Sequence, residues 1–307
     1  MTRRLSLPGP LCLAALAAIV AVAAVAIAQE RPVFRTGVDL VRLDALVTDG
    51  SRPIGGLTAA DFEVRDQGVM QKVQVATQAG DVSVALALDT SGSLEEGRLD
   101  GLVRAIEALM NLLAPADTVS LVTFSDRLVV RADSTRDITI VRAALQQAAP
   151  SGMTAVWDGL FAGLSLGRGG ADRSLVLLFT DGLENASWLS EQQITESVKR
   201  SQAVIYAVRP PEPPGKVSVG QAGYLEPARR RLQQVVGHSG GSVLDTDSDG
   251  RLPARFVGVL NEFRSRYLIT YEPTGVGRDD GWHRVEVRVR GRQAKIQVRP
   301  GYYANPR

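Results

Sequence analysis

Short, nearly continuous apolar runs recur through the middle of the chain, at 82–88, 119–124, 175–179 and 203–208. Strands that are apolar on both faces belong to parallel sheets that helices cover on both sides. The segments between these runs show the three-to-four spacing of amphipathic helices. This spacing covers residues 99–113, 140–145, 156–166, 191–200, 227–236 and 253–263. The alternation predicts an α/β fold with a doubly wound, mostly parallel sheet over residues 81–264.

Strict alternation of apolar and polar residues, which is typical of antiparallel strands, appears on both sides of this region. It covers residues 33–80, as at Val41 and Leu43, and residues 265–303, as at Val285. Neither flank is large enough to be stable alone, and the two ends of a domain often lie close together. We therefore expect the flanks to pair as one antiparallel β-domain into which the α/β domain is inserted. The alternative is two small, independent β segments.

The N-terminus has the three parts of a secretory signal peptide. Arg3 and Arg4 precede an unbroken apolar run at 11–28, which ends in an Ala-x-Ala pattern before polar residues. We expect residues 1–28 to be a cleaved signal peptide and the protein to be exported, periplasmic or secreted. The alternative is an uncleaved membrane anchor, since a run of about 18 apolar residues is the lower bound for spanning a bilayer.

Composition then limits the chemistry that the protein can perform. The 307 residues include 35 Lys+Arg, 33 Asp+Glu, two His and a single Cys, which is Cys12 of the signal segment. A disulfide framework and cysteine-based zinc sites are excluded. Because residues 1–28 hold two of the basic residues and no acidic one, the predicted mature chain carries 33 of each sign. It has no excess of positive charge for a nucleic-acid partner, and any site must be built mainly from oxygen ligands.

Oxygen-bearing side chains collect where the predicted parallel strands end. The first apolar strand runs into Asp89-Thr90-Ser91-Gly92-Ser93, and the third runs into Thr180-Asp181-Gly182. A Gly-containing loop before a predicted helix adds Thr154. Ligands of parallel α/β sheets bind beyond the carboxyl ends of the strands, and these hard oxygen ligands suit Mg²⁺, Mn²⁺ or Ca²⁺. The pattern therefore predicts a divalent-cation site at this edge.

The combination of Asp89-x-Ser91-x-Ser93, Thr154 and Thr180-Asp181-Gly182 resembles the metal-ion-dependent adhesion site of von Willebrand factor type A domains. More narrowly, the mature chain resembles a bacterial exported family related to that domain. The segments that carry this second resemblance are Leu57–Val64, Ser151–Asp158 and Arg299–Tyr303, with Met153 where the family pattern has Gly.

The resemblance implies a role for each of these residues. Ser91 and Ser93 would coordinate the metal through their hydroxyls, and Asp89, Thr154 and Asp181 would complete the site directly or through water. Mg²⁺ is the cation that we expect first, with Mn²⁺ or Ca²⁺ as alternatives. The metal would keep one position open for an acidic side chain, Asp or Glu, of a partner protein. By sequence, Asp126, Asp158 and Glu184 fall near the same edge, and we interpret them as rim or outer-shell residues.

One segment fits the pattern of a hydrolase nucleophile. Gly237-His238-Ser239-Gly240-Gly241 matches G-x-S-x-G, and Asp245, Asp247, Asp249 and His283 follow in the order of a Ser–Asp–His triad. A nucleophile elbow needs a strand before the Ser and a helix after it. Here a helix is predicted before the Ser and a short strand after it, which favours a helix end and a turn.

These patterns lead to three hypotheses about function. The first is an exported, non-enzymatic binding or adhesion protein that docks an acidic group through its metal site. The second is a metal-independent structural module of the cell envelope, and the remote third is a serine hydrolase that uses Ser239. The Pro/Gly-rich loop expected at 209–227 follows the strand at 203–208, so it could shape a partner surface at the same edge as the metal.

Overall fold

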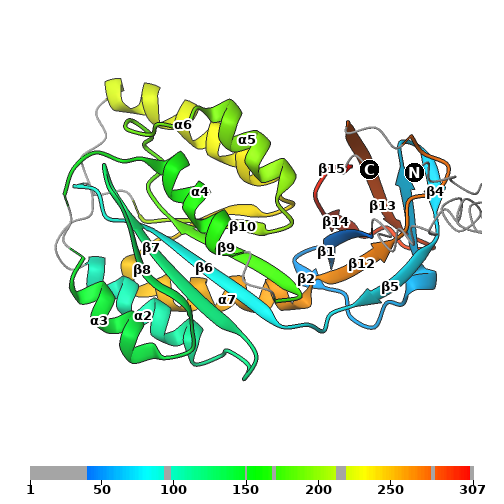
Figure 1. Ribbon diagram of the computed structural model, residues 1–307, viewed down its shortest axis with the longest axis horizontal. Helices are drawn as coiled ribbons and strands as arrows, with labels where there is room; N and C mark the ends of the chain where they lie inside the picture. The colour runs from blue at the N-terminus through cyan, green and yellow to red at the C-terminus, as the bar shows by residue number, and fades with distance from the viewer. Residues whose placement is uncertain are drawn as a thin grey trace, which may run out of the picture. The chain divides into compact units, whose positions relative to one another are not determined.

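A six-stranded sheet forms the centre of the α/β domain (Figure 1). The computed structural model describes residues 40–304, apart from 93–97, 149–150, 168–170, 212–218 and 278–280. The predicted signal peptide and Ser93 therefore lie outside the described residues. Within the described part, no helix is both long enough and apolar enough to cross a membrane.

The sheet has the order β11-β10-β9-β6-β7-β8. Its strands are β6 (Val82–Asp89), β7 (Thr118–Phe124), β8 (Leu128–Thr135), β9 (Arg173–Phe179), β10 (Val204–Arg209) and β11 (Ser242–Asp245). All neighbours are parallel except β8, which pairs with β7 in antiparallel orientation. The predicted α/β class with a mostly parallel sheet is confirmed. The antiparallel edge strand β8 was not predicted, because its exposed, mixed residues lack the continuous apolar run of the other strands.

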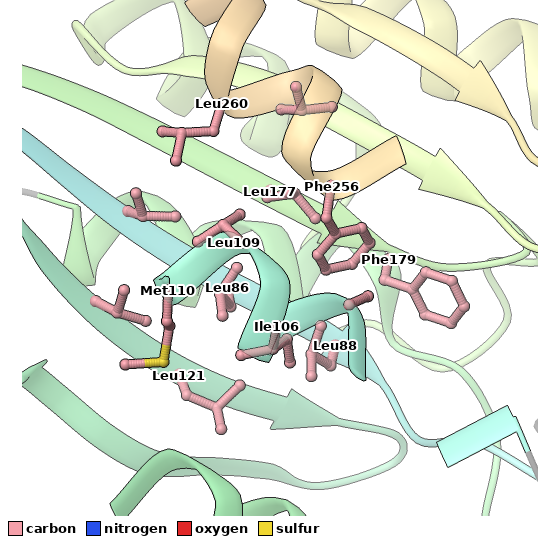
Figure 2. Packing of buried hydrophobic residues seen from close by; sticks show 14 of the residues in the cluster. Leu86, Leu88, Ile106, Leu109, Met110, Leu121, Leu177, Phe179, Phe256 and Leu260 are labelled. Carbon is pink, nitrogen blue, oxygen red and sulfur yellow. The ribbon is translucent and has the colours of Figure 1, made fainter. Parts of the chain in front are cut away.

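Helices cover both faces of this sheet (Figure 1). One face packs against α2 (Arg98–Met110), α3 (Ile138–Gln146) and α7 (Leu252–Ser265). The other face packs against α4 (Val156–Leu166), α5 (Glu191–Arg200) and α6 (Val219–Gly237). Figure 2 shows the first of these cores, in which Leu86 and Leu88 of β6 point toward Ile106 and Leu109 of α2. Two cores explain why the central strands are apolar on both sides.

Helix α6 differs from its prediction. The sequence predicted a loop up to Pro227 and a helix from that residue, because proline lacks the N–H that a helix interior needs. The helix instead begins at Val219 and continues through Pro227. The predicted loop over 209–227 is thus shorter, and residues 212–218 of it lie outside the described part.

Strands from the two flanks of the α/β domain pair with each other in two antiparallel sheets. The first sheet contains β1 (Val41–Asp49), β2 (Arg52–Pro53), β5 (Val73–Thr77), β12 (Tyr267–Tyr271) and β14 (Lys295–Gln297). The second contains β3 (Phe62–Asp66), β4 (Val69–Gln71), β13 (Trp282–Val289) and β15 (Gly301–Tyr303). Strand β1 lies between β12 and β14, and β3 pairs with β13. A shared apolar core joins the two sheets, so each flank completes the hydrogen bonding of the other.

Candidate metal centre

Three loops are joined by main-chain hydrogen bonds at the carboxyl edge of the central sheet. Thr90 N, after β6, donates to Phe124 O at the end of β7 (2.7 Å). The loop before α4 joins them through Ser151 N to Thr90 O (3.0 Å) and Gly92 N to Gly152 O (3.2 Å). Segments that are far apart in the sequence are therefore held together by main-chain hydrogen bonds, to which the Thr90 hydroxyl adds a bond to Phe124 O (3.2 Å).

Gly152 is required at this junction by its conformation and by its neighbours. Its φ of +78° lies in the left-handed region, and a Cβ there would lie 2.3 Å from Asp126 Oδ1. Asp126, one of the predicted rim residues, is exposed and accepts a hydrogen bond from Ser125 Oγ (3.1 Å). A side chain at position 152 would strain the loop that carries Thr154.

Asp89 is the buried centre of the predicted site, with 1% of its surface exposed. Its Oδ1 accepts a hydrogen bond from Ser91 N (2.9 Å), and its Oδ2 accepts one from Thr180 Oγ1 (2.7 Å). The Thr180 hydroxyl also accepts a bond from Gly182 N (3.0 Å). Thr180 thereby links the ends of β6 and β9 and positions Asp89, a role that the sequence pattern did not assign to it.

The buried carboxylate of the predicted site lies in the field of the second one. Burial, together with the negative charge of Asp181, raises the pKa of Asp89 to about 6 against the opposing hydrogen bonds from Ser91 and Thr180. Asp181 Oδ1 accepts a bond from Leu183 N (3.0 Å). A buried carboxylate whose ionised form is disfavoured is a place where a cation would be stabilising.

Thr154 is brought to the same edge by a second contact that the sequence did not reveal. Thr154 N donates to Asn185 Oδ1 (2.8 Å), and Thr154 O accepts from Asn185 N (3.0 Å). Asn185 follows β9 closely in the chain, so this pair ties the loop after β9 to the loop before α4. No hydrogen bond of the Thr154 hydroxyl is found among the described residues, which leaves this oxygen available as a ligand.

The other two residues predicted as rim or outer-shell residues hold loops through hydrogen bonds. Asp158 accepts bonds from Trp188 N (2.9 Å) and Leu189 N (3.0 Å). Glu184 accepts bonds from Trp157 N (3.1 Å) and Ser187 Oγ (2.6 Å). Both carboxylates therefore fix the segment after β9 against the beginning of α4, on which Thr154 depends.

The donor set fits a hard divalent cation. Asp89 and Asp181 supply two negative charges, and Ser91 and Thr154 supply neutral oxygens, which matches the preference of Mg²⁺ and Ca²⁺ for oxygen ligands. Ser93, the fifth predicted ligand, lies outside the described residues. In the described part of the chain, no group of three or more His, Cys, Asp or Glu is arranged to hold a metal, so this site depends on hydroxyls as well as carboxylates.

Ser239, the candidate nucleophile, holds a turn together. Its side chain is buried, with 5% of the residue exposed. The hydroxyl donates to Val236 O (2.7 Å) and accepts from Ile205 N (3.0 Å) and Gly241 N (3.1 Å). His283, the only histidine after Ser239, contacts Asp66 in the β-domain, with 3.1 Å between its Nδ1 and Asp66 Oδ1. The Ser239 hydroxyl is thus committed to structural bonds, as the turn interpretation predicts.

The fold and this edge define a doubly wound α/β domain with an oxygen-lined site where its parallel strands end. Residues 84–184 match the family model of the von Willebrand factor type A domain. The chain therefore contains a von Willebrand factor type A domain, and the predicted resemblance to this domain is confirmed over residues 84–184. A search of curated proteins finds no match.

Several solved structures are similar to this chain. The PilB minor pilin from Streptococcus sanguinis is 16% identical, with a TM-score of 0.47, over 61% of this chain and 62% of the pilin. This chain thus spans less than two thirds of that pilin's length. An aerotolerance-related membrane protein from Bacteroides fragilis is 16% identical, with a TM-score of 0.44, over 60% of this chain and 98% of that protein. The conserved hypothetical protein BatB from Bacteroides thetaiotaomicron is 18% identical, with a TM-score of 0.44, over 59% of this chain and 98% of BatB.

Proposed function

We propose that this protein is an exported, non-enzymatic binding protein whose von Willebrand factor type A domain docks an acidic group of a partner protein through a divalent cation. The ligands are Asp89, Ser91, Ser93, Thr154 and Asp181, and the cation is Mg²⁺ in the first place, with Mn²⁺ or Ca²⁺ as alternatives. When bound, the cation supplies a positive charge with an open coordination position for an Asp or Glu of the partner. The protein acts in the periplasm or after secretion.

The observation that carries this proposal is the joint position of Asp89 and Asp181. Asp89 ends β6 and Asp181 follows its parallel neighbour β9, in which Phe179 is paired with Leu88. Thr180 fixes one oxygen of Asp89 and Ser91 N fixes the other. The chain therefore holds a buried carboxylate in one orientation beside a second, less buried one, and a cation between them would offset their repulsion.

The second candidate is a structural module of the cell envelope that needs no metal. The observation that favours it is the hydrogen-bond network of the loops, because Thr180, Asn185, Asp158 and Glu184 fix the edge without any ion. The two candidates differ in one measurable property, which is the response of the folded protein to divalent cations.

The test is the melting temperature of the purified protein during titration with MgCl₂, MnCl₂ or CaCl₂, after treatment with chelator. The wild-type protein should become more stable as the cation is added, because a ligand that binds only the folded state stabilises it by mass action. Asp181→Asn and Asp89→Ala should abolish this increase. Asp49→Ala, which removes an exposed carboxylate from the β-domain, is the matched control and should respond like the wild type.

The partner is tested separately by affinity capture. Wild-type protein and Asp181→Asn would be used as bait with and without chelator. Proteins captured by the wild type only when the metal is present are the expected result. The outcome of the melting-temperature titration decides between the two candidates. Equal stabilisation of wild type and Asp181→Asn by every cation, or no stabilisation up to millimolar concentrations, would contradict the metal site and favour the structural module.

A further inference from the structure

A cavity of about 450 Å³ lies at the opposite edge of the central sheet, where the parallel strands begin. The α/β domain contributes Leu164, Arg173, Ser174 and Arg200 to its lining, and the β-domain contributes Arg42 and Leu268, among others. The volume falls within the range of about 300–1,000 Å³ that is typical of small-molecule sites. The metal centre has no part in it.

The most buried charged residue of the lining is Arg173, which is 2% exposed. Its Nε donates to Asp44 Oδ1 (2.8 Å), its Nη2 donates to Phe263 O (2.9 Å), and its guanidinium lies 4.4 Å from the centre of the Phe263 ring. Among the described residues, its Nη1 has no hydrogen-bond partner although it is buried, and the adjacent Ser174 Oγ is in the same situation. A buried donor without a partner costs about 1–3 kcal/mol.

The charges around the cavity do not cancel. Three arginines and two aspartates line it, so it has an excess of one positive charge. Asp44 is already paired with Arg173. Among the described residues, neither Arg42 nor Arg200 forms a salt bridge, and the Arg200 guanidinium lies 4.1 Å from the centre of the Tyr303 ring. Two exposed guanidinium groups therefore remain for a ligand.

The C-terminal end of α5 carries free carbonyls, whose partial negative charge would repel an anion in the cavity. Arg299 binds these carbonyls. Arg299 Nη1 donates to Ser201 O (2.7 Å), and Arg299 Nη2 donates to Lys199 O. These bonds satisfy carbonyls at the negative end of the helix dipole. Arg299 therefore offsets the negative helix end that lies next to the cavity.

We propose that this cavity binds a small organic acid, whose carboxylate is received by the exposed guanidinium groups of Arg42 and Arg200. Guanidinium groups bind carboxylates well because their N–H groups form a planar fork that matches the two oxygens. The apolar side chains of Leu164 and Leu268 line the same cavity, and its volume is far larger than the roughly 30 Å³ that one water occupies. Both features favour an organic acid over an inorganic ion.

The test uses succinate, benzoate and inorganic phosphate as probes, with sodium chloride at equal ionic strength as the reference. Binding would be measured by isothermal titration and by the melting temperature, with chelator present so that the metal centre is not involved. We expect saturable binding of at least one of the two organic acids, tighter than that of phosphate. Arg42→Gln and Arg200→Gln should each weaken it about tenfold, which corresponds to the loss of one charge-assisted hydrogen bond.

Two further variants separate binding from folding. Ser174→Ala removes a buried hydroxyl that has no hydrogen-bond partner among the described residues, so the melting temperature of the free protein should stay equal or rise and the binding of the organic acid should persist. Arg104→Gln, at an exposed arginine of α2, should bind like the wild type. The proposal is overturned if neither organic acid binds saturably, if phosphate binds as tightly as both, or if Arg104→Gln weakens binding as much as Arg42→Gln and Arg200→Gln.

Discussion

Arg266, which follows α7, is a buried arginine whose removal should destabilise the whole protein. It is 0% exposed and donates from Nε to Tyr206 Oη (2.9 Å) and from Nη2 to Gly240 O (2.8 Å) in the α/β domain. Its Nη1 donates to Asp44 O (3.2 Å) and Gln297 O (3.4 Å) in the β-domain. The Arg266 side chain thus donates hydrogen bonds to acceptors in both domains. The substitution Arg266→Met tests how much these bonds contribute to stability.

The size of the effect follows from what methionine leaves behind. Methionine keeps the apolar volume of the arginine stem but gives none of these acceptors a donor. A buried polar group without its partner costs about 1–3 kcal/mol, and breaking a buried charged network costs about 3–5 kcal/mol. Because some acceptors keep other partners, we expect the free energy of unfolding to fall by about 4 kcal/mol. For a domain of this size, that lowers the melting temperature by about 8–16 °C.

The assay is urea unfolding followed by circular dichroism and by tryptophan fluorescence. Arg288→Met is the matched control, because the Arg288 side chain is 71% exposed and its removal should change the stability by less than about 0.5 kcal/mol. A loss below about 1 kcal/mol in Arg266→Met would refute the view that this arginine joins the two domains. So would a loss of equal size in Arg288→Met.

Three further predictions concern single residues. Burial raises the pKa of Asp89 to about 6, so the metal-free protein should lose stability as the pH rises from about 4 to about 7, because the unfolded chain then ionises more readily. Stabilisation by Mg²⁺ should instead grow over that interval, and melting curves with and without Mg²⁺ measure both trends, which Asp89→Asn should remove. Gly241→Ala should prevent folding or lower the melting temperature steeply, because its Cβ would lie 1.7 Å from Ile205 O. Ser239→Ala should cost about 1–3 kcal/mol of stability, since Ile205 N loses its acceptor, and should leave any esterase activity of a purified sample unchanged.

The central fold was predictable because a strand that is buried on both faces has a nearly continuous run of apolar residues. The run Val82–Leu88 has no polar face, so it had to lie between two layers of helix, as the structure shows. The edge strand β8 has no continuous apolar run, because most of its residues are exposed or half-buried. The start of α6 was also unpredictable, since local rules place Pro227 at a helix start while the surrounding chain carries the helix through it.

The candidate site was predictable in its residue types and in its place, but not in how its parts are held. Asp89, Thr154 and Asp181 each follow a strand or precede a helix, which local patterns reveal. The partners that orient them come from other loops, as Thr180 does for Asp89 and Asn185 does for Thr154. Such pairs depend on which loops meet in space, and spacing along a single sequence does not encode this directly.

The contacts between the two domains lie at the edge of the sheet opposite the candidate metal centre. Arg173 begins β9, Gly240 precedes β11, and Arg299 reaches the carbonyls of Ser201 and Lys199 before β10. All of these positions are at the amino ends of parallel strands, whereas Asp89 and Asp181 lie at the carboxyl ends. The β-domain can therefore be fixed by buried arginines without covering the loops that hold the proposed cation.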